Sequence, residues 1–176
     1  MISILALFLQ ATAAPAPAPA PVAPWTVTPR PNADPTITST VVGTPSSDGN
    51  ARLVMRCDSG KERVVSVQLF TKTALGGPPD RPVTLTIDGG TPLGANWEFV
   101  EKGAYIREDV AVTTLTTAIA GGKAIKLHTT TAAGEPIDAS FAGPPSAAPV
   151  TTLLGACGYT LGTPPVRVDP NAKKPK

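Results

Sequence analysis

The sequence predicts a mainly β fold, with an α+β fold as the neighbouring possibility. The expected architecture is a single antiparallel domain, either β-sandwich-like or a curled sheet, with two short helices. Several segments alternate apolar and polar residues with a period of two, which is typical of half-buried strands. The chain has 21 prolines among 176 residues, which disfavours a helical bundle. Its hydrophobic share of 41% and charged share of 16% exclude a long coiled coil, a strongly charged disordered chain and a multi-span membrane protein.

The strands follow from this alternation and from the turn residues between them. We expect strands at 25–27, 37–42, 51–57, 63–71, 83–88, 97–100, 104–107, 124–131 and 137–141. Prolines interrupt the first two segments and confine them to edges or loops. The clearest alternation is at 83–88, where Asp88-Gly89-Gly90 closes the strand as a turn. Hairpins are expected between the third and fourth segments and between the last two, and a further pair is expected between the sixth and seventh.

Two helices complete the expected fold. Glu108 or Asp109 can begin the first helix, which stops at Gly121-Gly122. Four threonines between them weaken this prediction, because β-branched side chains disfavour helix intrinsically. The second helix covers about 150–157, where apolar residues recur at helical spacing, and it ends at Gly158.

Composition also predicts segments outside the domain. Residues 1–13 are expected to form a signal peptide, because the apolar run at 2–9 precedes the small-x-small sequence that a signal peptidase accepts. The alternative is a disordered hydrophobic N-terminus. Residues 14–24 alternate Ala and Pro and predict an extended spacer. The globular domain is expected at 25–162, followed by a disordered basic tail at 163–176.

Charge is concentrated in that tail. It carries a net charge of +3, whereas residues 25–162 carry −1. The folded part therefore lacks the gathered Lys and Arg that binding to a nucleic acid requires, and no nucleic-acid partner is expected. Lys173, Lys174 and Lys176 fit an ordinary solubilising terminus, with contact to an anionic surface as the alternative. The run at 2–9 is shorter than the ~20 residues that span a bilayer, so no membrane span is expected after signal removal.

The chain contains two cysteines, Cys57 and Cys157, without a CxxC or His-Cys spacing for zinc or redox chemistry. In an oxidising compartment two lone cysteines are expected to pair. The alternative is two buried free thiols. A bond between them would close a loop of about 100 residues, for which the chain-entropy model gives roughly 4.7 kcal/mol.

Candidate catalytic residues are few. His128 falls on the polar side of an expected strand, and Asp138 on the neighbouring strand could join it in a Ser-His-Asp arrangement. No nucleophile elbow accompanies the pair, so a solvated histidine is the preferred interpretation. A glycosidase needs two carboxylates, but no spacing selects a pair among the acids. These acids are Asp88, Glu98, Glu101, Glu108, Asp109 and Asp138.

No catalytic, cofactor or metal site is expected from these residues. The glycine pairs form no phosphate-binding motif, and a single histidine cannot anchor a histidine-rich metal site. Trp25 and Trp97 are expected to pack in the core, with exposed ligand-binding aromatics as the alternative.

A set of short motifs between residues 51 and 159 resembles a known family. The motifs are Arg56-Cys57, Ile87-Asp88-Gly89, Trp97, Gly121-Gly122-Lys123, Phe141-Ala142-Gly143 and Leu153-Leu154-Gly155-Ala156-Cys157-Gly158-Tyr159. In this order they resemble the type VI secretion-associated TagO/VasI-like family and, more loosely, the invasion-associated locus B proteins. The resemblance implies a bacterial periplasmic β-rich domain with bonded cysteines. It implies an accessory or interaction role and brings no catalytic residues.

These observations favour an exported, disulfide-containing, non-enzymatic accessory or binding protein of the bacterial cell envelope. The expected location is periplasmic or secreted, and the expected partner is an envelope or secretion-apparatus protein. The alternative is a small envelope hydrolase that acts on glycan or peptide through His128 and Asp138 or through a pair of acids.

Overall fold

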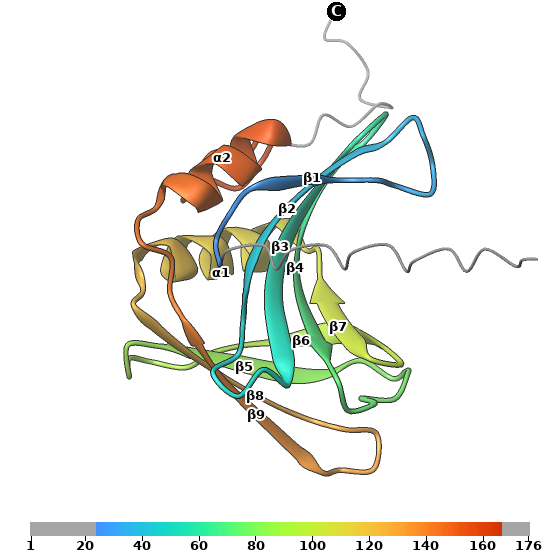
Figure 1. The fold of residues 1–176 in the computed structure, drawn as a ribbon, viewed down its shortest axis with the longest axis vertical. Coiled ribbons are helices and arrows are strands. Elements are labelled where there is room, and N and C mark those ends of the chain that lie inside the picture. The colour runs from blue at the N-terminus through green and yellow to red at the C-terminus, as the bar shows by residue number, and fades with distance from the viewer. Residues whose placement is uncertain (1–23, 167–176) are drawn as a thin grey trace, which may run out of the picture.

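The computed structural model describes residues 24–166 and contains nine strands and two helices (Figure 1). The predicted signal peptide, residues 14–23 of the predicted spacer and residues 167–176 of the predicted tail lie outside the described residues. The strands are β1 (Thr28–Arg30), β2 (Thr38–Pro45), β3 (Ala51–Ser59), β4 (Arg63–Thr71), β5 (Arg81–Ile87), β6 (Leu93–Val100), β7 (Gly103–Ile106), β8 (Ala124–Thr130) and β9 (Pro136–Ala142). The helices are α1 (Asp109–Gly121) and α2 (Ala148–Ala156). The predicted mainly β class with two short helices is confirmed.

All nine strands belong to one antiparallel sheet with the order β1-β2-β3-β4-β7-β6-β5-β8-β9. The three strand pairs expected from the sequence, β3–β4, β6–β7 and β8–β9, are present. Three further pairs, β1–β2, β2–β3 and β5–β6, join strands that follow each other in the chain. The long-range pairs β4–β7 and β5–β8 complete the order. They are the pairs for which no short turn in the sequence provides a signal.

The sheet curls so that the β2–β3 turn and Trp25 meet β9. The backbone N–H of Ser47, in the turn between β2 and β3, donates to the carbonyl of Ser140 in β9 at 2.8 Å. The indole Nε1 of Trp25 donates to the carbonyl of Ala142 at 3.0 Å. Of the two architectures expected from the sequence, the structure is the curled sheet. The β2–β3 turn approaches β9 without forming a ladder with it (Figure 1).

Both helices pack on the inner face of this sheet, α1 against β4 and α2 against β2 and β3 (Figure 1). Each buries an apolar stripe that fills the space enclosed by the curl. Alternation in the strands supplies the other side of the core, since Leu53, Met55 and Cys57 point inward together. One apolar core therefore serves the whole domain.

Helix α1 forms despite its threonines because its first turn is capped and its apolar side is buried. The Glu108 carboxylate accepts from the backbone N–H groups of Val110 and Ala111 and caps the helix. The threonine hydroxyls donate to carbonyls of the preceding turn, as Thr116 does to Val112 at 2.7 Å, which satisfies the hydroxyls but does not itself favour the helix. Burial of Leu115 and Ile119 then outweighs the low intrinsic propensity.

Both tryptophans lie in the core, as predicted. Trp25 is 5% exposed and Trp97 is fully buried. The indole Nε1 of Trp97 is the one buried side-chain N or O atom without a hydrogen-bond partner among the described residues. Three strands have boundaries that differ from the prediction by three residues or more. Strand β2 ends at Pro45 instead of residue 42 and pairs with both β1 and β3. It is therefore an inner strand and not the edge strand or loop that the prolines predicted, because the prolines that precede it lie outside the strand. The first strand begins at Thr28 instead of residue 25, because Trp25 turns inward with a positive φ of 60°. Strand β6 begins at Leu93 instead of residue 97, because it pairs along β5.

Within residues 24–166, neither helix has the length and apolar character that crossing a membrane requires.

Candidate functional site

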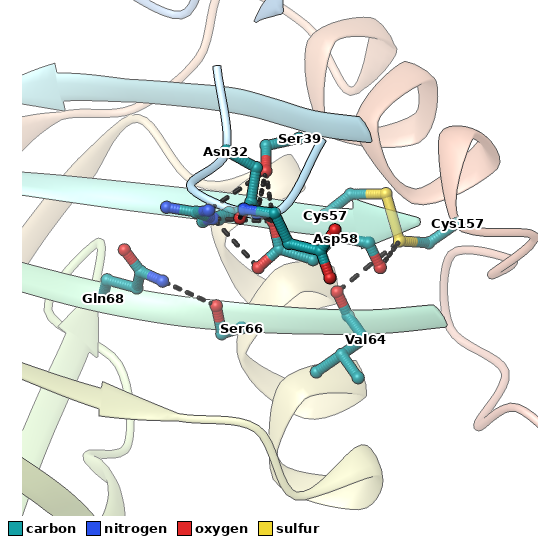
Figure 2. Close-up of polar contacts among 10 residues, drawn as sticks. Asn32, Ser39, Cys57, Asp58, Val64, Ser66, Gln68 and Cys157 are labelled. Atoms are coloured by element: carbon teal, nitrogen blue, oxygen red, sulfur yellow. Dashed lines mark hydrogen bonds and ion pairs between the residues drawn. A yellow bond between two sulfur atoms is a disulfide. The ribbon is translucent and has the colours of Figure 1, made fainter. Parts of the chain in front are cut away.

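The structure joins Cys57 and Cys157 in a disulfide (Figure 2). Cys57 lies near the end of β3 and points into the core, and Cys157 is the residue that caps the C-terminus of α2. Their Cα atoms are 5.8 Å apart, although 100 residues separate them in sequence. The bond therefore ties the second helix to the centre of the first half of the sheet.

A polar cluster surrounds the same end of β3 on the outer face of the sheet (Figure 2). The guanidinium Nε of Arg56 donates to both carboxylate oxygens of Asp58, at 2.8 and 2.9 Å. The fully buried hydroxyl of Ser39 donates to the same carboxylate and accepts from Nη2 of Arg56 at 3.0 Å. The amide of Asn32 donates to Ser39 Oγ at 2.9 Å. Three segments of the chain meet here.

The polar groups of this cluster engage one another and join three segments of the chain. The Asp58 carboxylate already accepts from three side chains, Asn32, Ser39 and Arg56. Ser39 is paired with Asp58 across the β2–β3 ladder, which fixes their separation. No pattern in the sequence signals this cluster, because Asn32 reaches it from a loop and its partners are distant in the chain.

His128 and Asp138 meet as the expected hairpin register requires. They are directly opposite on β8 and β9, and Nδ1 of His128 lies 2.8 Å from Oδ1 of Asp138. The side chains are 57% and 75% exposed and lie on the outer face of the sheet, away from the helices. On β5, Thr84 is opposite His128, yet among the described residues no serine or threonine hydroxyl bonds to the histidine. The arrangement places the pair in solvent and not in an enclosed cleft.

The remaining candidate acids are spread over the molecule, each with a local role. Asp88 has a φ of 51° and accepts from the backbone N–H groups of Lys123 and Ala124, so it anchors the connection between α1 and β8. Glu108 caps α1. Asp109 accepts from the hydroxyl of Tyr159 at 2.9 Å. Glu101 lies in the turn between β6 and β7, and its carbonyl accepts from Leu75.

Glu98 belongs to a separate polar group with Tyr105 and Arg107. The Tyr105 hydroxyl donates to Oε2 of Glu98 at 2.7 Å, and Nε of Arg107 donates to Oε1 at 3.1 Å. This hydrogen bond to a carboxylate raises the pKa of Tyr105, and burial adds to the shift. The group borders a shallow pocket that Asp80 and Glu108 also line. Two of the candidate acids therefore line this pocket, and both are engaged, Glu98 by Arg107 and Glu108 as the cap of α1.

An open groove lies between β9 and the β2–β3 turn, where no strand ladder joins the two parts of the curled sheet. Pro136, Ile137, Asp138 and Ala139 of β9 form one wall, and the facing wall comes from the β2–β3 turn and the adjoining ends of β3 and β4. Asp48 in that turn accepts from the Ser46 hydroxyl and from Asn50, which lowers the pKa of its carboxyl to about 2. Its carboxylate is therefore ionised at neutral pH.

Residues 24–166 contain no group of three or more His, Cys, Asp or Glu side chains that could hold a metal ion.

The fold and these sites define a disulfide-bonded antiparallel β domain with a curled sheet. No family model matches the chain, and no curated protein matches it. A solved structure to which the chain is similar is invasion-associated protein B from Bartonella henselae, with 17% sequence identity and a TM-score of 0.44. The similarity covers 69% of this chain and 83% of that chain. This neighbour is an invasion-associated protein, the group to which the sequence showed the looser of its two resemblances. The resemblance to the TagO/VasI-like family stays a prediction.

Proposed function

We propose that this chain is an exported, non-enzymatic accessory or binding protein of the bacterial cell envelope, located in the periplasm or secreted. The disulfide is the observation that carries the proposal. Structural disulfides persist in oxidising compartments and are rare in the bacterial cytosol. The bond between Cys57 and Cys157 is buried in the core and joins distant elements, so it supports a structural role.

The binding role, as opposed to catalysis, is supported by the placement of the polar residues. His128 and Asp138 are more than half exposed, and the other acids hold a helix cap, a turn or a tyrosine. A general acid and base gain their altered reactivity from burial or from close charges. The surface around His128 and Asp138 is open to solvent. Asp48 lines the same groove as Asp138, but hydrogen bonds lower the pKa of its carboxyl, which does not suit a general acid.

Export is tested by expressing the full chain in a bacterial host and fractionating the cells. We expect the protein in the periplasm or medium, cleaved after residue 13 or 14, with a Cys57–Cys157 linked peptide in mass spectrometry without reductant. The matched control is a chain lacking residues 1–13, which should remain in the cytosol. An intact N-terminus and free thiols in the full chain would overturn the proposal.

The hydrolase alternative is tested on the purified protein. Wild type and His128→Ala are incubated with peptidoglycan fragments and with casein, and products are followed by mass spectrometry. We expect identical traces from the two proteins and from buffer. Product formation that His128→Ala abolishes would assign an enzyme instead.

A further inference from the structure

We propose that the outer edge of β9 binds an extended, basic peptide segment of an envelope partner, which joins the sheet as an added strand. This inference rests on the proposed function and gives it a site and a partner class. It is carried by three features of one place in the molecule: unpaired backbone groups, an adjoining groove and the charge of that groove.

The direction of the β9 backbone follows from its neighbours. The carbonyls of Ser140 and Ala142 accept from Ser47 and Trp25, which lie on the side away from β8. In an antiparallel strand the N–H and C=O of one residue point to the same side, and residues alternate. Consistently, Gly143 and Thr131 bond across the hairpin to Lys123 and Glu135. The backbone groups of residues 136, 138, 140 and 142 therefore face the outer edge.

Part of this edge is covered and part is open. Ser47 and Trp25 occupy the carbonyls of Ser140 and Ala142. Among residues 24–166, nothing bonds to the edge-facing N–H and C=O of Asp138, the C=O of Pro136 or the N–H of Ser140. An antiparallel strand opposite Asp138 would pair with these groups in the ordinary ladder pattern.

The groove beside this edge suits an inserted strand better than a small molecule. Its volume is about 190 Å³, below the 300–1,000 Å³ typical of small-molecule sites. Ile137 and Ala139 line it on the inner side, and Ala51 lies on the facing wall. A residue opposite Asp138 points outward with Asp138, and its neighbours point toward these apolar side chains. The site therefore favours alternating polar and apolar residues.

The charge of the groove favours basic residues at the polar positions of the partner segment. Asp48 and Asp138 are the charged side chains that line the groove, and both are acidic. A lysine or arginine opposite Asp138 would place opposite charges on a directly facing cross-strand pair. A second copy of β9 centred on this residue would instead place Asp138 opposite Asp138, which is unfavourable. The occupant that fits is a basic segment of another protein.

The test uses the full mature chain and a synthetic peptide of seven alternating lysine and valine residues with blocked ends. We expect binding by calorimetry, with amide NMR shifts concentrated at 137–140 and 48–51. The control peptide has the same sequence with N-methyl groups on the amides that would face β9. It should bind at least about tenfold more weakly, because the ladder bonds are lost while charge is kept.

Two protein variants separate backbone from charge. Ser140→Pro removes one edge-facing N–H and leaves the β8 ladder intact, so peptide affinity should fall severalfold. Asp138→Asn should weaken binding about two- to fivefold at low salt, whereas the matched control Glu62→Gln, in the β3–β4 turn, should not change it. Circular dichroism checks that each variant is folded.

Equal affinity for the N-methylated peptide, or no binding of either peptide, would overturn the inference. A dimer in sedimentation that Ser140→Pro dissociates would assign the edge to a second copy and would also overturn it. Each of these outcomes leaves export and the disulfide unaffected, so failure of this inference is distinct from failure of the proposed function.

Discussion

At the β1 end of the sheet several contacts reinforce the strand ladder, whereas at the β9 end few do. The first end has the Cys57–Cys157 disulfide and the buried Ser39 hydroxyl within the Arg56–Asp58 cluster. The last strand has, beyond its ladder to β8, the contacts from Ser47 and Trp25. Side-chain contacts and a disulfide therefore hold the β1 end of the sheet, while the β9 end retains unpaired backbone N–H and C=O groups.

The two edge strands differ in the same sense. Strand β1 spans three residues and contains Pro29, which lacks a backbone donor, so it is a poor template for another strand. Strand β9 spans seven residues, and its proline is at its first position. Short, proline-containing edges resist pairing with other chains. The open edge is therefore at β9.

The largest effect is expected from removing the disulfide. The double variant Cys57→Ala, Cys157→Ala should lose up to roughly 4.7 kcal/mol in the free energy of unfolding, because the cross-link restrains a loop of about 100 residues in the unfolded chain. Urea unfolding followed by circular dichroism measures it. A loss below about 1 kcal/mol would mean that the β1 end does not depend on the bond.

A smaller effect is expected from the polar cluster beside it. Asp58→Asn should cost about 1–2 kcal/mol, because it removes the charge that Arg56 and the buried Ser39 engage at a partly exposed site. Glu62→Gln makes the same charge change in the adjacent turn and should be near neutral. Equal unfolding midpoints in urea for the two variants would contradict the role given to this cluster.

Between the two ends lies the Asp88 anchor. Asp88→Ala should cost about 1 kcal/mol, since two backbone N–H groups lose their acceptor and alanine disfavours a positive φ. Asp88→Asn keeps an acceptor and tolerates this backbone conformation, so it should retain most of the stability. Thermal unfolding of both variants measures the difference, and the reverse order would refute the assignment.

The smallest effect is expected on the outer face of the β9 end. His128→Gln should change the free energy of unfolding by less than about 0.5 kcal/mol, because the His128–Asp138 pair is exposed. The measurement is urea unfolding at pH 7, beside Asp58→Asn. A loss as large as that of Asp58→Asn would remove the contrast between the two ends of the sheet.

Local features of this fold could be predicted from the sequence, and long-range pairings could not. Alternation marked β3, β4 and β8, because each strand exposes one face to water. The pairing of β4 with β7 could not be predicted, because β5 and β6 lie between them in sequence and no short turn joins the two strands. The first half of β6 was missed because Gly94 and Asn96 have low strand propensity and are held by β5.

The same division applies to the candidate sites. The pairing of Cys57 with Cys157 could be predicted, because the chain holds no other cysteine. The register of His128 with Asp138 followed from the hairpin. The groove beside β9 could not be anticipated, because it forms between residues that are brought together by the curl of the whole sheet.

The long loop closed by the disulfide has a consequence for proteolysis. A single cut anywhere between Cys57 and Cys157 leaves the two fragments covalently joined, because the disulfide links one to the other. The sequence separation of 100 residues means that most of the domain lies within this loop. The cut passes unnoticed on a denaturing gel without reductant and appears as two bands after reduction. In a protease-rich environment, a nicked molecule would keep its second helix attached to β3.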